Sequence, residues 1–118
     1  MEFKLNRVNG SYLQVNISGE CTREEILDLP NRMKKYCDNN NCTGVLLDSN
    51  NINCSLISVL DQHTFGQAIA DSFGPSTTVA ILGNDLLFTR FLETVAFNRG
   101  ANIKVSNNLD ELLLWLKK

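Results

Sequence analysis

The sequence predicts an α/β domain in which an N-terminal β-hairpin is followed by helices and strands in the order ββαβαβαβα. Three observations support this: two alternating segments at the start, two later apolar runs without alternation, and amphipathic segments between and after them. Uninterrupted apolar runs are typical of strands covered on both faces, as in a parallel sheet. At 118 residues the chain is expected to form one domain, residues 1–118.

The predicted hairpin occupies the first residues. EFKLN alternates, and YLQVNIS alternates more clearly, with Leu13, Val15 and Ile17 on one face. Asn9-Gly10 lies between them, and both residues accept the positive φ of a tight hairpin turn. The chain is therefore expected to begin with an antiparallel pair that has one solvated face.

A first helix is predicted from Thr22 to about Asp38. Thr22 and Glu25 have the spacing of a capping box, in which each side chain binds the other residue's backbone N–H. Pro30 falls inside the helix, removes one of its hydrogen bonds and predicts a bend or break near Asp28 to Pro30.

The rest of the chain alternates strands and helices. Strands are predicted at Gly44–Asp48 and Thr78–Leu82, with a half-exposed edge strand at Ile103 and Val105. Helices are expected at about 55–73, 85–99 and 108–117. Asn108 has the pattern of a cap, and the last helix places four leucines on one face: Leu109, Leu112, Leu113 and Leu116.

Composition excludes several classes of function. The net charge is −2 and no basic run occurs, which argues against a nucleic-acid partner. No stretch approaches the length of a membrane span, and MEFKLNRVNG lacks the apolar region of a signal peptide. We therefore expect a cytoplasmic protein.

The four cysteines do not have the spacing of a metal site. Only Cys37 and Cys42 are close in sequence, and His63 is the sole histidine. Buried thiols are the preferred interpretation. We expect no metal, no cofactor and no catalytic cysteine.

The segment FLETVAFNRG is the most distinctive of the chain. In helical register it gives a core-facing stripe, an Arg99 charge at the negative end of the helix dipole and a stop at Gly100. Glu93 and Arg99 are not on adjacent turns, and no pair of nucleophile and base emerges. The segment predicts no catalytic residue, and we expect no enzyme.

With the predicted element order, this segment resembles the C-terminal signature of the bacterial STAS-like, or SpoIIAA-like, proteins. The matching residues are Phe91, Glu93, Thr94, Val95, Ala96, Asn98, Arg99 and Gly100, followed by Trp115 and Leu116. The resemblance implies the STAS-like mixed sheet over the whole chain. Many members of this subgroup have no assigned biochemical role.

Better-known STAS domains are anti-sigma-factor antagonists, so the resemblance implies a regulatory, protein-binding module. In that group a serine at the start of the second helix is phosphorylated, and Ser55 takes its place here. Asn53, Cys54 and Leu56 depart from the family's motif at this point. The favoured alternative makes Ser55 the cap of the helix.

A ligand or anion site is a second candidate, at the carboxyl edge of the parallel strands. The loops expected there are DSNNINCS, from Asp48 to Ser55, and Gly83-Asn84-Asp85. The candidate residues are Asp48, Ser49, Asn50, Asn53, Ser55 and Asn84. A solvated loop is the alternative, because Asn, Ser and Asp are also turn-forming residues.

The second helix carries two apolar stripes on nearly opposite sides. Leu56, Val59 and Leu60 form one, and a second set, assigned as the candidate patch for a partner or ligand, comprises Phe65, Ile69 and Phe73. Either the helix kinks at Gly66 or one stripe is free. A protein partner or homodimer is the first hypothesis, and a small apolar or amphipathic ligand in an enclosed cavity is the alternative.

Overall fold

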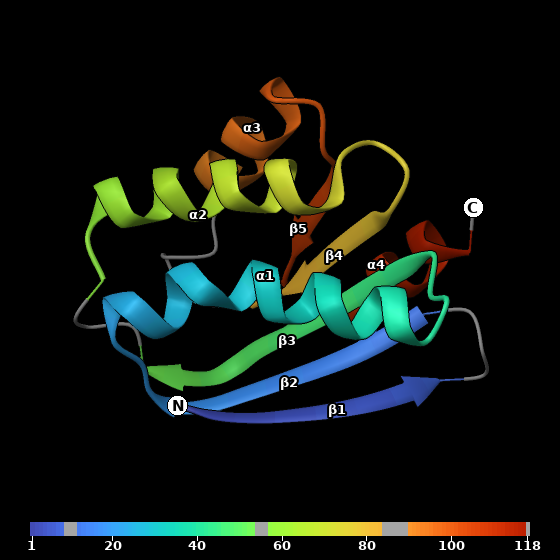
Figure 1. Cartoon of the computed structure of the whole chain (residues 1–118), viewed down its shortest axis with the longest axis horizontal. Coiled ribbons are helices and arrows are strands. Elements are labelled where there is room, and N and C mark those ends of the chain that lie inside the picture. Colours follow the sequence, from blue (N-terminus) through green and yellow to red (C-terminus); the bar gives the residue numbers. More distant parts are fainter. Residues whose placement is uncertain (9–11, 54–56, 84–89, 118) are drawn as a thin grey trace.

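The computed structural model describes residues 1–8, 12–53, 57–83 and 90–117 (Figure 1). The predicted order ββαβαβαβα is confirmed. In chain order the elements are β1 (Glu2–Val8), β2 (Tyr12–Glu20), α1 (Arg23–Asn39), β3 (Gly44–Asn53), α2 (Val59–Phe73), β4 (Thr78–Leu82), α3 (Arg90–Asn98), β5 (Asn102–Ser106) and α4 (Leu109–Leu116).

The strands form one mixed sheet in the order β1-β2-β3-β4-β5. β1 and β2 are antiparallel, with Phe3 opposite Ile17 and Leu5 opposite Val15. The pairs β2–β3, β3–β4 and β4–β5 are parallel. The predicted hairpin is therefore confirmed as a strand pair, whereas its turn at Asn9-Gly10 lies outside the described residues.

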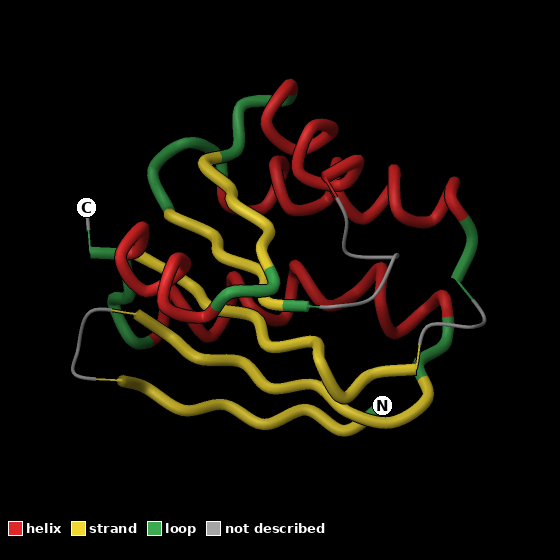
Figure 2. The backbone as a smooth tube through the Cα atoms, turned by 180° about the vertical axis from the view of Figure 1, so that it is seen from behind, coloured by secondary structure: helices red, strands yellow, loops and turns green. Residues whose placement is uncertain are grey.

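Two apolar layers cover the sheet unequally. Helices α1, α2 and α3 contribute to the main core on one face, which includes Val15, Met33, Phe65 and Leu92. Helix α4 lies on the other face of the sheet (Figure 2). There Leu112 packs with Leu46, Ala80 and Leu82. Because α4 spans only Leu109–Leu116, it leaves most of the β1 and β2 part of that face uncovered, although Tyr12 at the start of β2 packs against this second core.

Helix α1 begins as its sequence predicts. Thr22 and Glu25 form a complete capping box. The helix continues through the buried Pro30 to Asn39, so it is not split there, and the bend expected near Asp28 to Pro30 stays a prediction. Its end depends on Asn41, which has φ of 54° and lets the Cys42 N–H reach the Cys37 carbonyl at 3.0 Å.

The N-cap predicted for the last helix, α4, is confirmed, but only some of the leucines predicted to face the core do so. The Asn108 side chain accepts the Glu111 N–H at 3.2 Å. Leu112 is buried, and Leu113 and Leu116 pack against the second core. Leu109, the first residue of the helix, is exposed instead.

Candidate functional site

The predicted DSNNINCS loop is largely a strand. β3 does not end at Asp48 but continues to Asn53, and beyond Asp48 it pairs only with β2. The register changes there, since Asn16 lies opposite Asp48 and Ser18 opposite Asn51. Two β3 residues therefore face one β2 residue, which makes this a β-bulge at the point where β3 leaves β4.

Two candidate residues of this segment have structural hydrogen bonds. The buried Ser49 donates its hydroxyl to the Leu82 carbonyl at 2.8 Å, at the end of β4. A carboxylate oxygen of Asp48 accepts the Asn50 N–H at 3.1 Å, within the bulge. Asn50 and Asn53 are exposed. The structure thus brings Asp48, Ser49 and Asn50 together mainly to stabilise the bulge.

A shallow depression of about 570 Å³ lies beside the bulge, on the uncovered face of β1, β2 and β3. Its polar lining comprises Glu2, Lys4, Asn16, Ser18, Asp48 and Asn51. These groups can hydrogen-bond a polar molecule, but the depression is open and its walls are solvated side chains. It is a weak candidate for a ligand site.

The N-cap of α2 lies three residues later than expected. Ser58 is the N-cap: its hydroxyl accepts the Asp61 N–H at 3.1 Å, and Asp61 accepts the Ser58 N–H at 3.1 Å. Ser55 and Asn84 lie outside the described residues. The cap role predicted for Ser55 belongs to Ser58, and Ser55 phosphorylation stays a prediction that intact-mass measurement of protein from native cells would test.

Asp61 also connects α2 to α1. The Arg23 guanidinium donates to Asp61 at 2.7 Å, and the Asp61 side chain is nearly buried whereas that of Arg23 is half-exposed. The Ser58 backbone N–H, aided by Arg23, holds the pKa of Asp61 below its usual range although burial opposes that shift. The first turn of α2 is therefore fixed by a cap and an ion pair together.

This lowered pKa makes stability depend on pH. The ionised Asp61 stabilises the fold above the pKa of an unfolded aspartate, and this contribution is lost as the pH falls through the lower folded value. At neutral pH, Asp61→Asn is expected to be less stable than the wild type. The difference should narrow below about pH 4, measured by urea unfolding of both proteins at several pH values. A difference that stays constant down to pH of about 2 would contradict the role given to the carboxylate.

The assignment of Phe65, Ile69 and Phe73 to a free patch is wrong. All three are buried, at 2%, 0% and 2% exposure, and belong to the main core. Gly66 explains how α2 packs so tightly, because a Cβ there would lie 3.1 Å from side-chain atoms of both Leu92 and Val95 in α3. The side of α2 predicted to receive a ligand is therefore filled by the protein itself.

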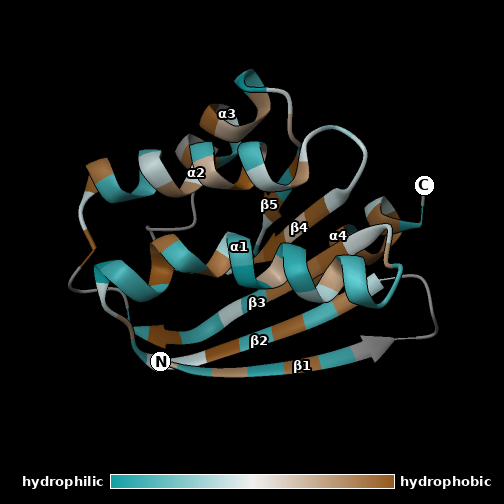
Figure 3. Cartoon of the chain, viewed as in Figure 1, coloured by the Kyte–Doolittle hydropathy of each residue, from teal (hydrophilic) through white to brown (hydrophobic). Residues whose placement is uncertain are grey.

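The described residues of the other stripe are exposed, and its third member, Leu56, lies outside the described residues. Val59 and Leu60 are 67% and 72% exposed, and they are adjacent in the first turn of α2. Figure 3 shows this turn as a hydrophobic end of the helix, at the left of the view. The pattern Ser58-x-x-Asp61 is itself a capping signature and could have located this helix start in the sequence.

The stop that FLETVAFNRG predicts at Gly100 is confirmed, whereas Arg99 lies just beyond α3 and not in its last turn. Gly100, with φ of 99°, ends α3, and the Ala101 N–H bonds the Ala96 carbonyl at 3.0 Å. Two contacts were not foreseen: Glu93 accepts the Val105 N–H of β5 at 2.7 Å, and Arg99 approaches Asp71 of α2 at 3.4 Å. Its polar residues join α3 to its neighbours.

The sequence predicts buried thiols, and this is confirmed for three of the four cysteines: Cys21, Cys37 and Cys42. Burial, with a smaller contribution from Cys42, raises the pKa of Cys37 to about 11, so this thiol stays protonated at neutral pH. Cys54 lies outside the described residues. Within the described ranges, no group of three or more His, Cys, Asp or Glu side chains is placed to hold a metal ion.

In the part of the chain that the structure describes, no helix has the length and apolar character that crossing a membrane requires.

The fold is similar to two solved structures. One is an uncharacterized protein of the DUF3478 family from Shewanella loihica PV-4, described as having a SpoIIAA-like fold; identity is 16%, the TM-score is 0.59, and 98% of this chain and 92% of that chain are covered. The other is the anti-sigma factor antagonist SpoIIAA in its unphosphorylated form, with 10% identity, a TM-score of 0.56 and coverage of 98% and 96%. The chain has the SpoIIAA-like fold.

The STAS-like architecture expected from the C-terminal segment is thereby confirmed over almost the whole chain. A scan against protein-family models found no match, and neither did a search of curated proteins. At 10% and 16% identity, the SpoIIAA-like similarity concerns the fold.

Proposed function

We propose that this chain is a cytoplasmic, non-enzymatic regulatory module that binds another protein through the first turn of α2. The observation that carries the proposal is the pair of adjacent exposed side chains, Val59 and Leu60. Elsewhere the described apolar side chains of α2 are mostly buried, so this turn stands out on the helix. The SpoIIAA-like fold supports a module of this class, since one protein with that fold is an anti-sigma factor antagonist.

The turn has the properties of a binding anchor. The capping box of Ser58 and Asp61 and the Arg23 ion pair hold it in place before any partner arrives, so little ordering is required on binding. Full burial of an exposed valine or leucine contributes about 1.5–3 kcal/mol, so the pair can supply a substantial part of a moderate affinity.

A site-specific photo-crosslinker placed at Leu60 tests the proposal. In native cells, irradiation is expected to give a discrete crosslinked species, whose mass distinguishes a different protein from a second copy of this chain. Val59→Ser with the crosslinker at Leu60 should reduce its yield several-fold, because the apolar anchor is halved. Val59→Ser should change the free energy of unfolding by no more than about 0.5 kcal/mol, since the side chain is exposed.

Leu114 provides the matched control. It is 67% exposed, like Val59, but lies on α4 on the opposite face of the sheet. A crosslinker at Leu114 should not give the same species. The same product from both positions, or none from Leu60, would rule out the first turn of α2 as the contact.

A further inference from the structure

The outer edge of β1 is open to another strand. β1 is seven residues long and is an edge strand of the sheet, and none of the described strands pairs with its outer side. Alternate N–H and carbonyl groups of such an edge point outward and can bond an added strand. The opposite edge differs, because the Glu93 carboxylate already accepts the Val105 N–H of β5.

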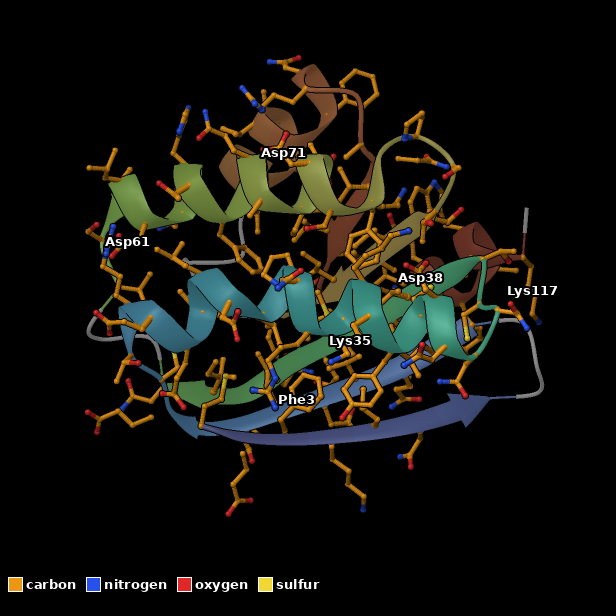
Figure 4. The ribbon with its side chains drawn as sticks, viewed as in Figure 1. Phe3, Lys35, Asp38, Asp61, Asp71 and Lys117 are labelled. Atoms are coloured by element: carbon orange, nitrogen blue, oxygen red, sulfur yellow. The ribbon has the colours of Figure 1, made fainter. Side chains whose placement is uncertain are left out.

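A basic and aromatic groove runs beside this edge. One face of α1 lines a hollow of about 360 Å³ through Arg32, Lys35, Tyr36 and Asn39. Phe3 of β1 joins it to the edge: its ring lies 6.1 Å from that of Tyr36, and the Arg32 guanidinium lies 4.3 Å above it. Figure 4 shows Phe3 and Lys35 on the same side of the molecule, between β1 and α1.

The cations of this groove are available to a ligand. Among the described residues, neither Arg32 nor Lys35 forms an ion pair, whereas Lys34 on the same helix binds Asp38 at 2.9 Å. Both side chains are exposed. A positive groove next to unpaired backbone groups offers two kinds of contact to one extended segment.

We propose that β1 and α1 bind an extended acidic peptide, which adds to β1 as a further strand. Its backbone bonds the outer edge of β1, and its carboxylates on one face reach Arg32 and Lys35 of α1. Strand addition gives affinity through the main chain and selects sequences through alternate side chains. This surface is separate from the first turn of α2, and the proposal does not depend on the function proposed above.

A second copy of this chain suits the edge less well. Antiparallel pairing of two β1 strands around a twofold axis places both α1 helices on the same face of the joined sheet. Arg32 and Lys35 of both copies then add positive charge to the same face of the joined sheet, and like charges repel. The charge of the groove therefore favours an acidic partner over self-association.

The first test is fluorescence anisotropy with a labelled peptide of about eight alternating glutamate and threonine residues, the length of a typical strand. Saturable binding that weakens with salt is expected, and the matched peptide with lysine for glutamate should not bind. Lys35→Glu should weaken binding about fivefold, because an attraction becomes a repulsion. Lys117→Glu, the same charge change at an exposed residue of the C-terminal end, should alter binding less than twofold.

The second test probes the backbone and leaves the protein unchanged. The peptide is N-methylated at alternate residues in two versions, so that each version blocks the N–H groups of one edge. One version should lose binding at least tenfold and the other should keep it, because an added strand uses only one of its edges. The Leu60→Ser variant should bind the unmodified peptide like the wild type.

Three results would overturn the proposal. Equal binding of both N-methylated versions excludes strand addition, and equal binding of the lysine peptide excludes the charge contact. Sedimentation that shows a dimer strengthened by Lys35→Glu would assign the edge to a second copy of the chain instead.

Discussion

Replacing Phe65 with alanine is expected to lower the free energy of unfolding by about 3–5 kcal/mol, enough to unfold a large share of a marginally stable domain. Phe65 is 2% exposed and lies in the main core with residues of α1, α3 and the sheet. The substitution leaves a cavity that rigid neighbours cannot fill. Urea unfolding followed by circular dichroism measures the loss, which should appear as a lower midpoint with little change in slope.

Leu60→Ala is the matched control, because it truncates a large apolar side chain of the same helix. Leu60 is 72% exposed, so the free energy of unfolding of the Leu60→Ala variant should stay within about 0.5 kcal/mol of that of the wild type. Equal losses for the two variants would mean that both stripes of α2 are packed, and the proposed binding turn would then be untenable.

The two faces of α2 show what sequence periodicity can and cannot predict. Both stripes have helical spacing, so both predict a helix, and the helix is there. Which stripe faces the core depends on where α1 and α3 lie, and this is a tertiary property. Gly66 indicates which stripe is buried, because a buried glycine in a helix permits the close approach of a neighbouring element. Here the neighbours are Leu92 and Val95 of α3.

The segment after Asp48 illustrates a similar limit. Its Asn and Ser residues predicted a loop on local grounds. Pairing with the long strand β2 overrides this preference, since β2 extends to Glu20 and pairs with β3 as far as Asn53. Strand pairing between distant parts of the chain is not encoded in the composition of either segment.

Features that depend on neighbouring residues were predicted more successfully than contacts between distant segments. The capping box at Thr22, the cap at Asn108 and the left-handed Gly100 each depend on residues a few positions apart, and each is present. The contacts of Glu93 with β5 and of Arg99 with α2 join separate elements, so helical register alone could not show them. FLETVAFNRG thus indicated the fold correctly and gave no guide to the binding surface.

Gly66→Leu is expected to destabilise the protein by about 1–3 kcal/mol and to displace α3, for the opposite reason to Phe65→Ala. A Cβ at position 66 would already lie 3.1–3.2 Å from atoms of Leu92 and Val95, and a leucine adds three more carbons in the same direction. Urea unfolding measures the cost, and amide chemical shifts should change most in α3 and β5. Gln67→Leu, one residue further on and half-buried, should cost less than about 0.5 kcal/mol.

A second substitution shows whether crowding against α3 is the cause. Val95→Ala removes both γ carbons, one of which lies 3.1 Å from the position of the added Cβ. If the helices are in close contact there, the double variant Gly66→Leu/Val95→Ala should be more stable than the sum of the two single losses predicts, by about 0.5–3 kcal/mol. Additive losses would show that Gly66 is not the point of contact between α2 and α3. In that case packing against the sheet alone, and not against α3, would determine that the Phe65 stripe is buried while Val59 and Leu60 are exposed.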